Sequence, residues 1–258
     1  MENDSRNSCP WHGLAPPPEL REHLLCGWTI GPASGGTETM LPDGCMHIVW
    51  PEGDVPILAG PHTTHVPSRR LPGSTVVGAS FRPGAAPAVL AIPASELRDL
   101  RLPLVEVWDG RAELLALAIA DARSPSDRLK LIAEELRRRL NGAEPADRLV
   151  ATAVSRLNGA RLSRVRTIGE ELGISERQLR RRFHAAVGYG PKTLARVLRF
   201  QRLLALVSRR GARRGDLARL ALDAGYADQA HMTAEVKRLA GEPPARLLAA
   251  RPVVTAGI

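Results

Sequence analysis

The pattern of apolar and polar residues changes character near residue 85. Before that point, short runs rich in β-forming residues alternate with turn signals such as Pro42-Asp43-Gly44 and Gly60-Pro61. The clearest runs are residues 45–50, 55–59 and 75–81. Many short strands at this spacing predict a small β-sandwich or barrel.

Helical periodicity dominates after residue 85. It predicts short helices over residues 85–92 and 96–100, and longer ones over 111–121, 127–140 and 146–157. In the fourth of these, Leu129, Ile132, Leu136 and Leu140 form an apolar stripe, and Ser126 is the expected N-cap. The stripe fits either a dimer interface or the inner face of a helix packed on its own domain, and we favour the second.

Residues 169–188 carry a more specific pattern. Gly173 separates two helical segments, and Ser175 can cap the second one. Leu179 and Phe183 follow one turn apart and predict a buried face, whereas the neighbouring arginines point elsewhere. This order predicts a helix-turn-helix whose second helix fits the DNA major groove.

The same pattern returns near the C-terminus. Ser175 is followed by Leu179, Phe183 and Gly188 at offsets 4, 8 and 13, and Asp228 by Met232, Val236 and Gly241 at the same offsets. A small residue precedes the turn glycine by four positions in both copies: Gly169 before Gly173, and Ala221 before Gly225. Such an internal repeat is a stronger signal than either copy and predicts two tandem helix-turn-helix units.

This tandem arrangement resembles the AraC/XylS family of bacterial transcription regulators over roughly residues 160–250. Its most specific part is the second unit, where Ala221, Gly225, Tyr226, Asp228 and Met232 are followed by Gly241 and Pro244. The chain has Ala234, Val236 and Leu247 where the family pattern has an arginine, a phenylalanine and an aromatic residue. The resemblance implies a sequence-specific transcription regulator, expected to be an activator, that binds double-stranded DNA and contacts RNA polymerase.

The resemblance also implies an N-terminal domain that senses a small molecule or forms a homodimer, with a cupin-like fold. We therefore predict an α+β chain: a disordered tail over 1–18, a sensing or dimerisation domain over 19–142, a junction helix and linker over 143–160, and a DNA-binding domain over 161–250. The expected partners are duplex DNA, RNA polymerase, a second copy of the chain and a small-molecule effector, with no membrane and no cofactor.

The distribution of charged residues also divides the chain into an N-terminal and a C-terminal part. From Arg161 onward there are 20 basic and 8 acidic residues, a net charge of +12, whereas the preceding residues carry 16 basic and 19 acidic ones. A basic region beside a near-neutral one predicts a polyanionic partner for the first. Three cysteines, Cys9, Cys26 and Cys45, form no disulfide framework, and neither a secretory signal nor a run of 18 apolar residues is present, so we expect a cytoplasmic protein.

The residues expected to contact DNA lie on the two second helices. Arg177 and Arg181 are expected at base edges, Arg180 at bases or phosphate, and Arg182 on the flank. The arginine-rich first unit should dominate affinity. The complete set is Arg177, Gln178, Arg180, Arg181, His184, Gln229, Thr233 and Lys237.

A linker helix is predicted to start at Pro191, where a missing N–H costs nothing, and to carry the two units about one DNA turn apart. The basic segment 208–215 after it is expected to be a flexible loop that touches phosphate.

Two further interpretations concern the N-terminal half. Cys45, His47, His62 and His65 have the chemistry of a zinc site, but isolated residues of these types are more often structural, so no metal is predicted. The alternative function is a DNA-alkylation response protein in which Cys45 is the reactive cysteine. A module that binds RNA or protein is a third class, which the two-unit spacing favours less than duplex DNA.

Overall fold

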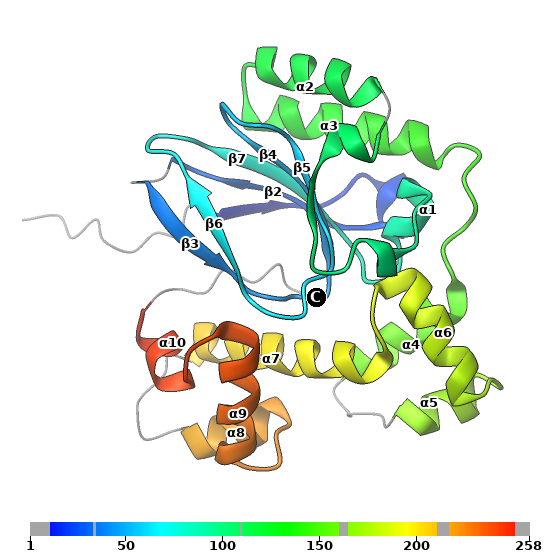
Figure 1. Ribbon diagram of the computed structural model, residues 1–258, viewed down its shortest axis with the longest axis vertical. Coiled ribbons are helices and arrows are strands. Elements are labelled where there is room, and N and C mark those ends of the chain that lie inside the picture. Colours follow the sequence, from blue (N-terminus) through cyan, green and yellow to red (C-terminus); the bar gives the residue numbers. More distant parts are fainter. Residues whose placement is uncertain (1–10, 33–34, 109, 160–164, 211–216, 251–258) are drawn as a thin grey trace, which may run out of the picture.

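The computed structural model describes residues 11–32, 35–108, 110–159, 165–210 and 217–250. Strands occupy the N-terminal part, and the C-terminal part is helical, with the long helix α7 (Pro191–Arg210) running beneath the sheets (Figure 1). This arrangement confirms the predicted α+β class, with a β-rich region ahead of an all-α one.

The main sheet is antiparallel and has six strands in the order β1-β2-β7-β4-β5-β8. A separate two-stranded sheet pairs β3 with β6. The strands are β1 (Trp11–Leu14), β2 (Leu24–Ile30), β3 (Gly36–Met40), β4 (Met46–Pro51), β5 (Ile57–Ala59), β6 (Val66–Arg70), β7 (Val76–Phe81) and β8 (Arg101–Pro103). The three strand runs named from sequence are therefore present, although β5 is shorter than expected.

The helices α2 (Arg111–Asp121) and α3 (Pro125–Leu140) cover one face of the main sheet (Figure 1). Ile132 and Leu136 on α3 are almost fully buried in the core that includes Ile48, Ala79 and Phe81. The apolar stripe of α3 thus packs on its own domain. The N-cap is Ser124, whose Oγ accepts from the Asp127 N–H at 3.1 Å, so the prediction of Ser126 was wrong by two residues.

Short helical elements lie between strands and, in one case, between the last strand and α2. They are α1 (Ala86–Leu90) and the 3-10 helices η1 (Pro18–Leu20), η2 (Ala94–Glu96) and η3 (Leu104–Glu106). The helix expected over 96–100 is absent, because the 3-10 turn ends at Glu96 and the chain then enters β8.

The predicted disordered tail over 1–18 is wrong for its second part. Trp11–Leu14 pairs with β2 as an edge strand, with Leu14 opposite Gly27. Backbone hydrogen bonds to an existing sheet edge order this segment, which its own polar and proline-rich composition does not reveal. Residues 1–10 lie outside the described part of the chain.

The helical part contains two similar sets of three helices followed by α10 (Pro244–Ala250). The first set is α4 (Arg148–Asn158), α5 (Val165–Glu171) and α6 (Glu176–Val187); the second is α7, α8 (Leu217–Ala224) and α9 (Gln229–Ala240). Helix α4, which the sequence leaves between domains, packs on α5 and α6 through Val150, Val154 and Leu157.

Helix α7 contributes to the hydrophobic cores of both units. Its first turns, with Leu194 and Leu198, enter the core of the first unit, and Phe200, Leu203 and Leu204 enter the core of the second. The helix continues through Arg210, so the start of the basic segment expected to be a loop is helical. Its remainder, 211–216, lies outside the described residues. Within the described segments, none of the helices combines the length and apolar character that a bilayer crossing requires.

Candidate nucleic-acid interface

Local signals build the first helix-turn-helix as the sequence predicts. The Ser175 Oγ accepts from the Gln178 N–H at 3.2 Å and begins α6, and Gly188 ends it with φ of 92°. Leu179 and Phe183 are fully buried. A Cβ on Gly169 would stand 3.1 Å from the Ile174 carbonyl oxygen, so this position of α5 needs a small residue for the tight turn into α6.

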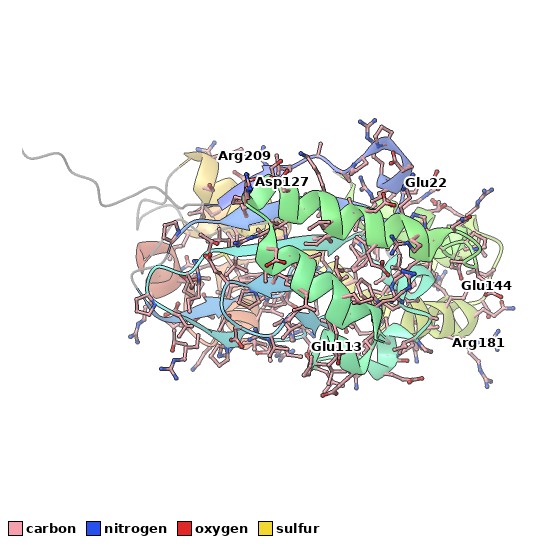
Figure 2. The ribbon with its side chains drawn as sticks, turned by 90° about the horizontal axis from the view of Figure 1, so that it is seen from above. Glu22, Glu113, Asp127, Glu144, Arg181 and Arg209 are labelled. Carbon is pink, nitrogen blue, oxygen red and sulfur yellow. The ribbon has the colours of Figure 1, made fainter. Side chains whose placement is uncertain are left out.

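The arginines of α6 separate into two groups. Arg180 pairs with Glu176 at 3.3 Å, and Arg182 pairs with Asp147, the N-cap residue of α4, at 2.7 Å. Among the described residues, Arg177 and Arg181 have neither an ion-pair nor a hydrogen-bond partner, and both are exposed. Figure 2 shows Arg181 projecting away from the ribbon at one end of the molecule. Two guanidinium groups one helical turn apart are thus left available to a ligand.

Gln178 and His184, the other expected contacts on α6, differ from these arginines. The Gln178 side chain closes a capping box by accepting from the Ser175 N–H at 2.9 Å, so its carbonyl oxygen is used within the helix N-terminus. His184 is half-buried near the other end of α6. Among the contacts expected on α6, Arg177 and Arg181 are therefore the side chains most available to a ligand.

The second unit repeats this construction. The Asp228 carboxylate accepts from the His231 N–H at 2.7 Å and caps α9, and Gly241 ends the helix with φ of 77°. Met232 and Val236 are fully buried. Val236, together with Leu247, fills the core in place of the larger aromatic residues of the family pattern.

The outward face of α9 is less charged than that of α6. Gln229, Ala230, Ala234 and Lys237 are exposed. Thr233 is half-buried, and its hydroxyl donates to the Gln229 carbonyl oxygen at 2.8 Å, which leaves its methyl group as the surface it can offer. The Gln229 amide would suit adenine and the small apolar groups a thymine methyl, whereas the Lys237 ammonium group would suit guanine or phosphate.

A charge cluster behind α9 was missed by sequence reasoning. Glu235 is 9% exposed, and its carboxylate lies 2.9 Å from the Arg196 Nε, 3.5 Å from Arg199 and 3.6 Å from the His231 Nε2. Arg199 also lies over the Tyr226 ring, 5.3 Å from its centroid. These contacts fix α9 on α7. The sequence offers one signal for this cluster. Glu235 stands seven residues after the N-cap of α9, and the equivalent position of α6 is Arg182, which also forms an ion pair.

The N-terminal histidines and cysteines have other roles. Within the described residues, no three His, Cys, Asp or Glu side chains gather as a metal site would require. His47 instead lies 2.9 Å from the Ser80 Oγ through Nδ1 and 3.2 Å from Asp43 through Nε2. The pKa of Asp43 stays below its usual range despite burial, because His47 and the Cys45 N–H hydrogen-bond to it.

The hydrogen-bonded chain Asp43–His47–Ser80 has the residue types of a hydrolase triad, but its surroundings do not suit catalysis. Ser80 is fully buried in the middle of β7, and its Oγ accepts from the Trp28 Nε1 at 2.9 Å. A hydroxyl without access to a substrate cannot act as a nucleophile, so this network holds β2, β4 and β7 together.

Cys45 does not have the environment of a reactive thiol. It is 1% exposed, and burial, together with the charge of Asp43, raises its pKa well above the ordinary value. The thiolate is the reactive form of cysteine, so this thiol is protonated and sheltered. The arrangement disfavours the alkylation-response interpretation.

Comparisons with known proteins bear on both halves. Residues 168–250 match the family described as helix-turn-helix domain, and residues 12–103 match a domain of unknown function (DUF6597). No curated protein matches the sequence significantly.

Similar solved structures include two of ToxT from Vibrio cholerae. One is 11% identical, covers 96% of this chain and 100% of that chain, and has a TM-score of 0.46. The other, wild-type ToxT bound to an unsaturated fatty acid, is 13% identical, covers 99% of each chain and has a TM-score of 0.45.

Proposed function

We propose that this chain, whose C-terminal part carries the tandem helix-turn-helix domain of the AraC/XylS family, is a sequence-specific DNA-binding regulator of transcription. One observation carries the proposal: the same cap, buried face and C-terminal glycine occur in α6 and α9, at opposite ends of α7 (Figure 1). In each of the two helices, the face opposite the buried residues is exposed to solvent.

Geometry and charge both favour duplex DNA as the ligand. With 20 residues, α7 is about 30 Å long, close to the roughly 34 Å that separates successive major grooves on one side of the duplex. Arg177 and Arg181 offer forked donors that fit guanine O6 and N7. In this proposal α6 supplies most of the affinity, and Gln229, Thr233 and Lys237 of α9 add a weaker second block.

The region over residues 19–142 is, in the same proposal, a domain that controls the DNA-binding region. A cavity of about 530 Å³ between the sheet, α3 and residues 14–17 has the size of a small-molecule site, and it supports an effector as the signal. Its apolar lining includes Leu24, Gly27, Ala79, Leu129, Ile132 and Ala133. Leu114 and Leu117, both about two-thirds exposed on α2, support dimerisation as the other signal.

The proposal is tested by fluorescence anisotropy with a labelled random DNA duplex of about three helical turns, competed by unlabelled RNA duplex of the same length. We expect DNA to be preferred and affinity to fall linearly with salt on logarithmic axes. The variant Arg177→Ala/Arg180→Ala/Arg181→Ala should lose most of the binding.

A matched control removes the same charge elsewhere. Arg69, Arg98 and Arg137 are exposed arginines of the N-terminal region, and replacing all three by alanine should leave affinity nearly unchanged. Equal losses in the two triple variants, or a preference for the RNA competitor, would contradict the proposal.

A further inference from the structure

The loop between β5 and β6 contacts both helix-turn-helix units. Pro61 lies against Gly188, where a Cβ on the glycine would stand 2.6 Å from the proline Cγ and 2.8 Å from the Ala94 carbonyl oxygen. Four residues later, the His65 ring lies against Gly241, where a Cβ would stand 2.4 Å from Cε1. Both glycines are thus covered by one short segment of the N-terminal region.

These two glycines are equivalent positions of the internal repeat. Each follows its N-cap by 13 residues, and each is the C-cap of the second helix of its unit, α6 or α9, here called the recognition helix. Both glycines have left-handed backbone conformations, with φ of 92° for Gly188 and 77° for Gly241. The Thr64 Oγ1 also donates to the carbonyl oxygen of Arg238, in the last turn of α9, at 3.2 Å. The loop therefore holds the same end of both helices.

The loop is itself fixed on the N-terminal region. The Thr63 N–H donates to the Asp99 carboxylate at 2.6 Å, and the Thr63 hydroxyl donates to the same group at 2.9 Å. The Gly60 N–H donates to the Leu100 carbonyl oxygen at 2.9 Å, and His62 is buried between these anchors. Because these hydrogen bonds hold the loop on the N-terminal region, the loop keeps its position relative to the sheet rather than adjusting its conformation to the helices.

A third tie lies between the two ends. Gln201, in the middle of α7, donates through Nε2 to the Pro42 carbonyl oxygen at 2.7 Å, and Leu41 packs against the second core. By contrast, α6 shows no extensive packing on α8 or α9 among the described helices. The two units are therefore joined by α7 and by the N-terminal region.

We propose that residues 61–65 brace the two recognition helices, so that the N-terminal region, together with α7, sets their relative orientation and the spacing of the two DNA blocks. Thr64 and His65 are positioning residues in this scheme, because they contact the C-terminal end of α9. The DNA part rests on the proposed function, whereas the brace itself does not.

The brace is tested first without DNA. Spin labels at Arg166→Cys and Leu222→Cys, two exposed sites in α5 and α8, report the distance between the units by pulsed electron resonance, with Cys9 and Cys26 replaced by serine. We expect one narrow distance in the parent chain and a broadened distribution in Thr64→Ala/His65→Ala. The control pair Thr37→Ala/Arg69→Ala, exposed in the two-stranded sheet of β3 and β6, should keep the narrow distance.

The second readout uses two-block DNA whose spacing is lengthened in single base-pair steps. The parent chain should lose roughly tenfold in affinity off its preferred spacing, and the Thr64/His65 variant should lose much less, while both keep the same affinity for one block. An unchanged distance distribution overturns the brace. Absence of DNA binding by the parent chain would instead overturn the proposed function, and the distance measurement would still decide the brace.

Discussion

Arg182 on α6 is bound to Asp147, the N-cap residue of α4, at 2.7 Å. The ion pair ties the recognition helix to the helix behind it. Arg181, the immediate neighbour of Arg182, has no such partner among the described residues and projects into solvent (Figure 2). Two adjacent arginines of the same helix thus have different tasks, one in holding the unit together and one at the surface proposed for DNA.

The first prediction separates these tasks on DNA. Arg181→Ala should weaken binding to a cognate site by about 1–3 kcal/mol and relax specificity at one base pair, because a bidentate guanine contact is lost. Arg182→Ala should leave sequence preference unchanged. Anisotropy titrations on the site and on single-base variants of it provide the measurement, and a common profile for the two variants would argue against the assignment.

The second prediction concerns stability. Asp147 accepts from the backbone N–H groups of Leu149 and Val150 and also pairs with Arg182, so Asp147→Ala removes a cap and an ion pair together. We expect a loss of about 1–2 kcal/mol in the free energy of unfolding, measured by urea denaturation. Arg182→Ala removes only a half-exposed ion pair and should cost less than about 1 kcal/mol. Equal losses would mean that the cap contributes nothing.

The third prediction concerns the charge cluster behind α9. Glu235→Gln leaves Arg196 and Arg199 without their carboxylate in a partly buried site, and we expect a loss of about 2–3 kcal/mol. The control is Glu176→Gln, which breaks an exposed pair and should cost less than about 1 kcal/mol. Hydrogen exchange should show the first loss concentrated in α8 and α9. Uniform loss of protection across the chain would refute that localisation.

The fourth prediction is a dependence on pH. Burial lowers the pKa of His62, so the native state holds this ring neutral where the unfolded chain already binds a proton. The cost of keeping His62 neutral in the native state is absent above the pKa of histidine in the unfolded chain, about 6.5, and it grows as the pH falls below that value. Acid should therefore lower the free energy of unfolding. His62→Gln should make the loss between about pH 7 and pH 5 smaller. An identical loss in the variant would remove His62 as its source.

Short-range signals predicted the recognition units well. Ser175 and Asp228 cap their helices, and Gly188 and Gly241 end them, because capping depends on residues within one turn. The buried positions Leu179, Phe183, Met232 and Val236 follow from helical periodicity alone.

Tertiary contacts account for what the sequence did not reveal. The strand Trp11–Leu14 depends on β2, more than ten residues away in the chain, and the attachment of α4 to the first unit depends on an apolar face that would suit either neighbour. The burial of Glu235 could not be predicted from the sequence, because only the fold brings Arg196 and Arg199 to its carboxylate. The DNA contacts of Arg177, Arg181, Gln229, Thr233 and Lys237 remain predictions.

The most direct test of the central claim is selection from a random-sequence duplex library by the purified full chain, near physiological ionic strength. We expect one enriched motif with two blocks about ten base pairs apart, the guanine-containing block matching α6. No enrichment, with binding that only fades as salt rises, would contradict sequence-specific recognition and leave the arginines of α6 as nonspecific phosphate contacts.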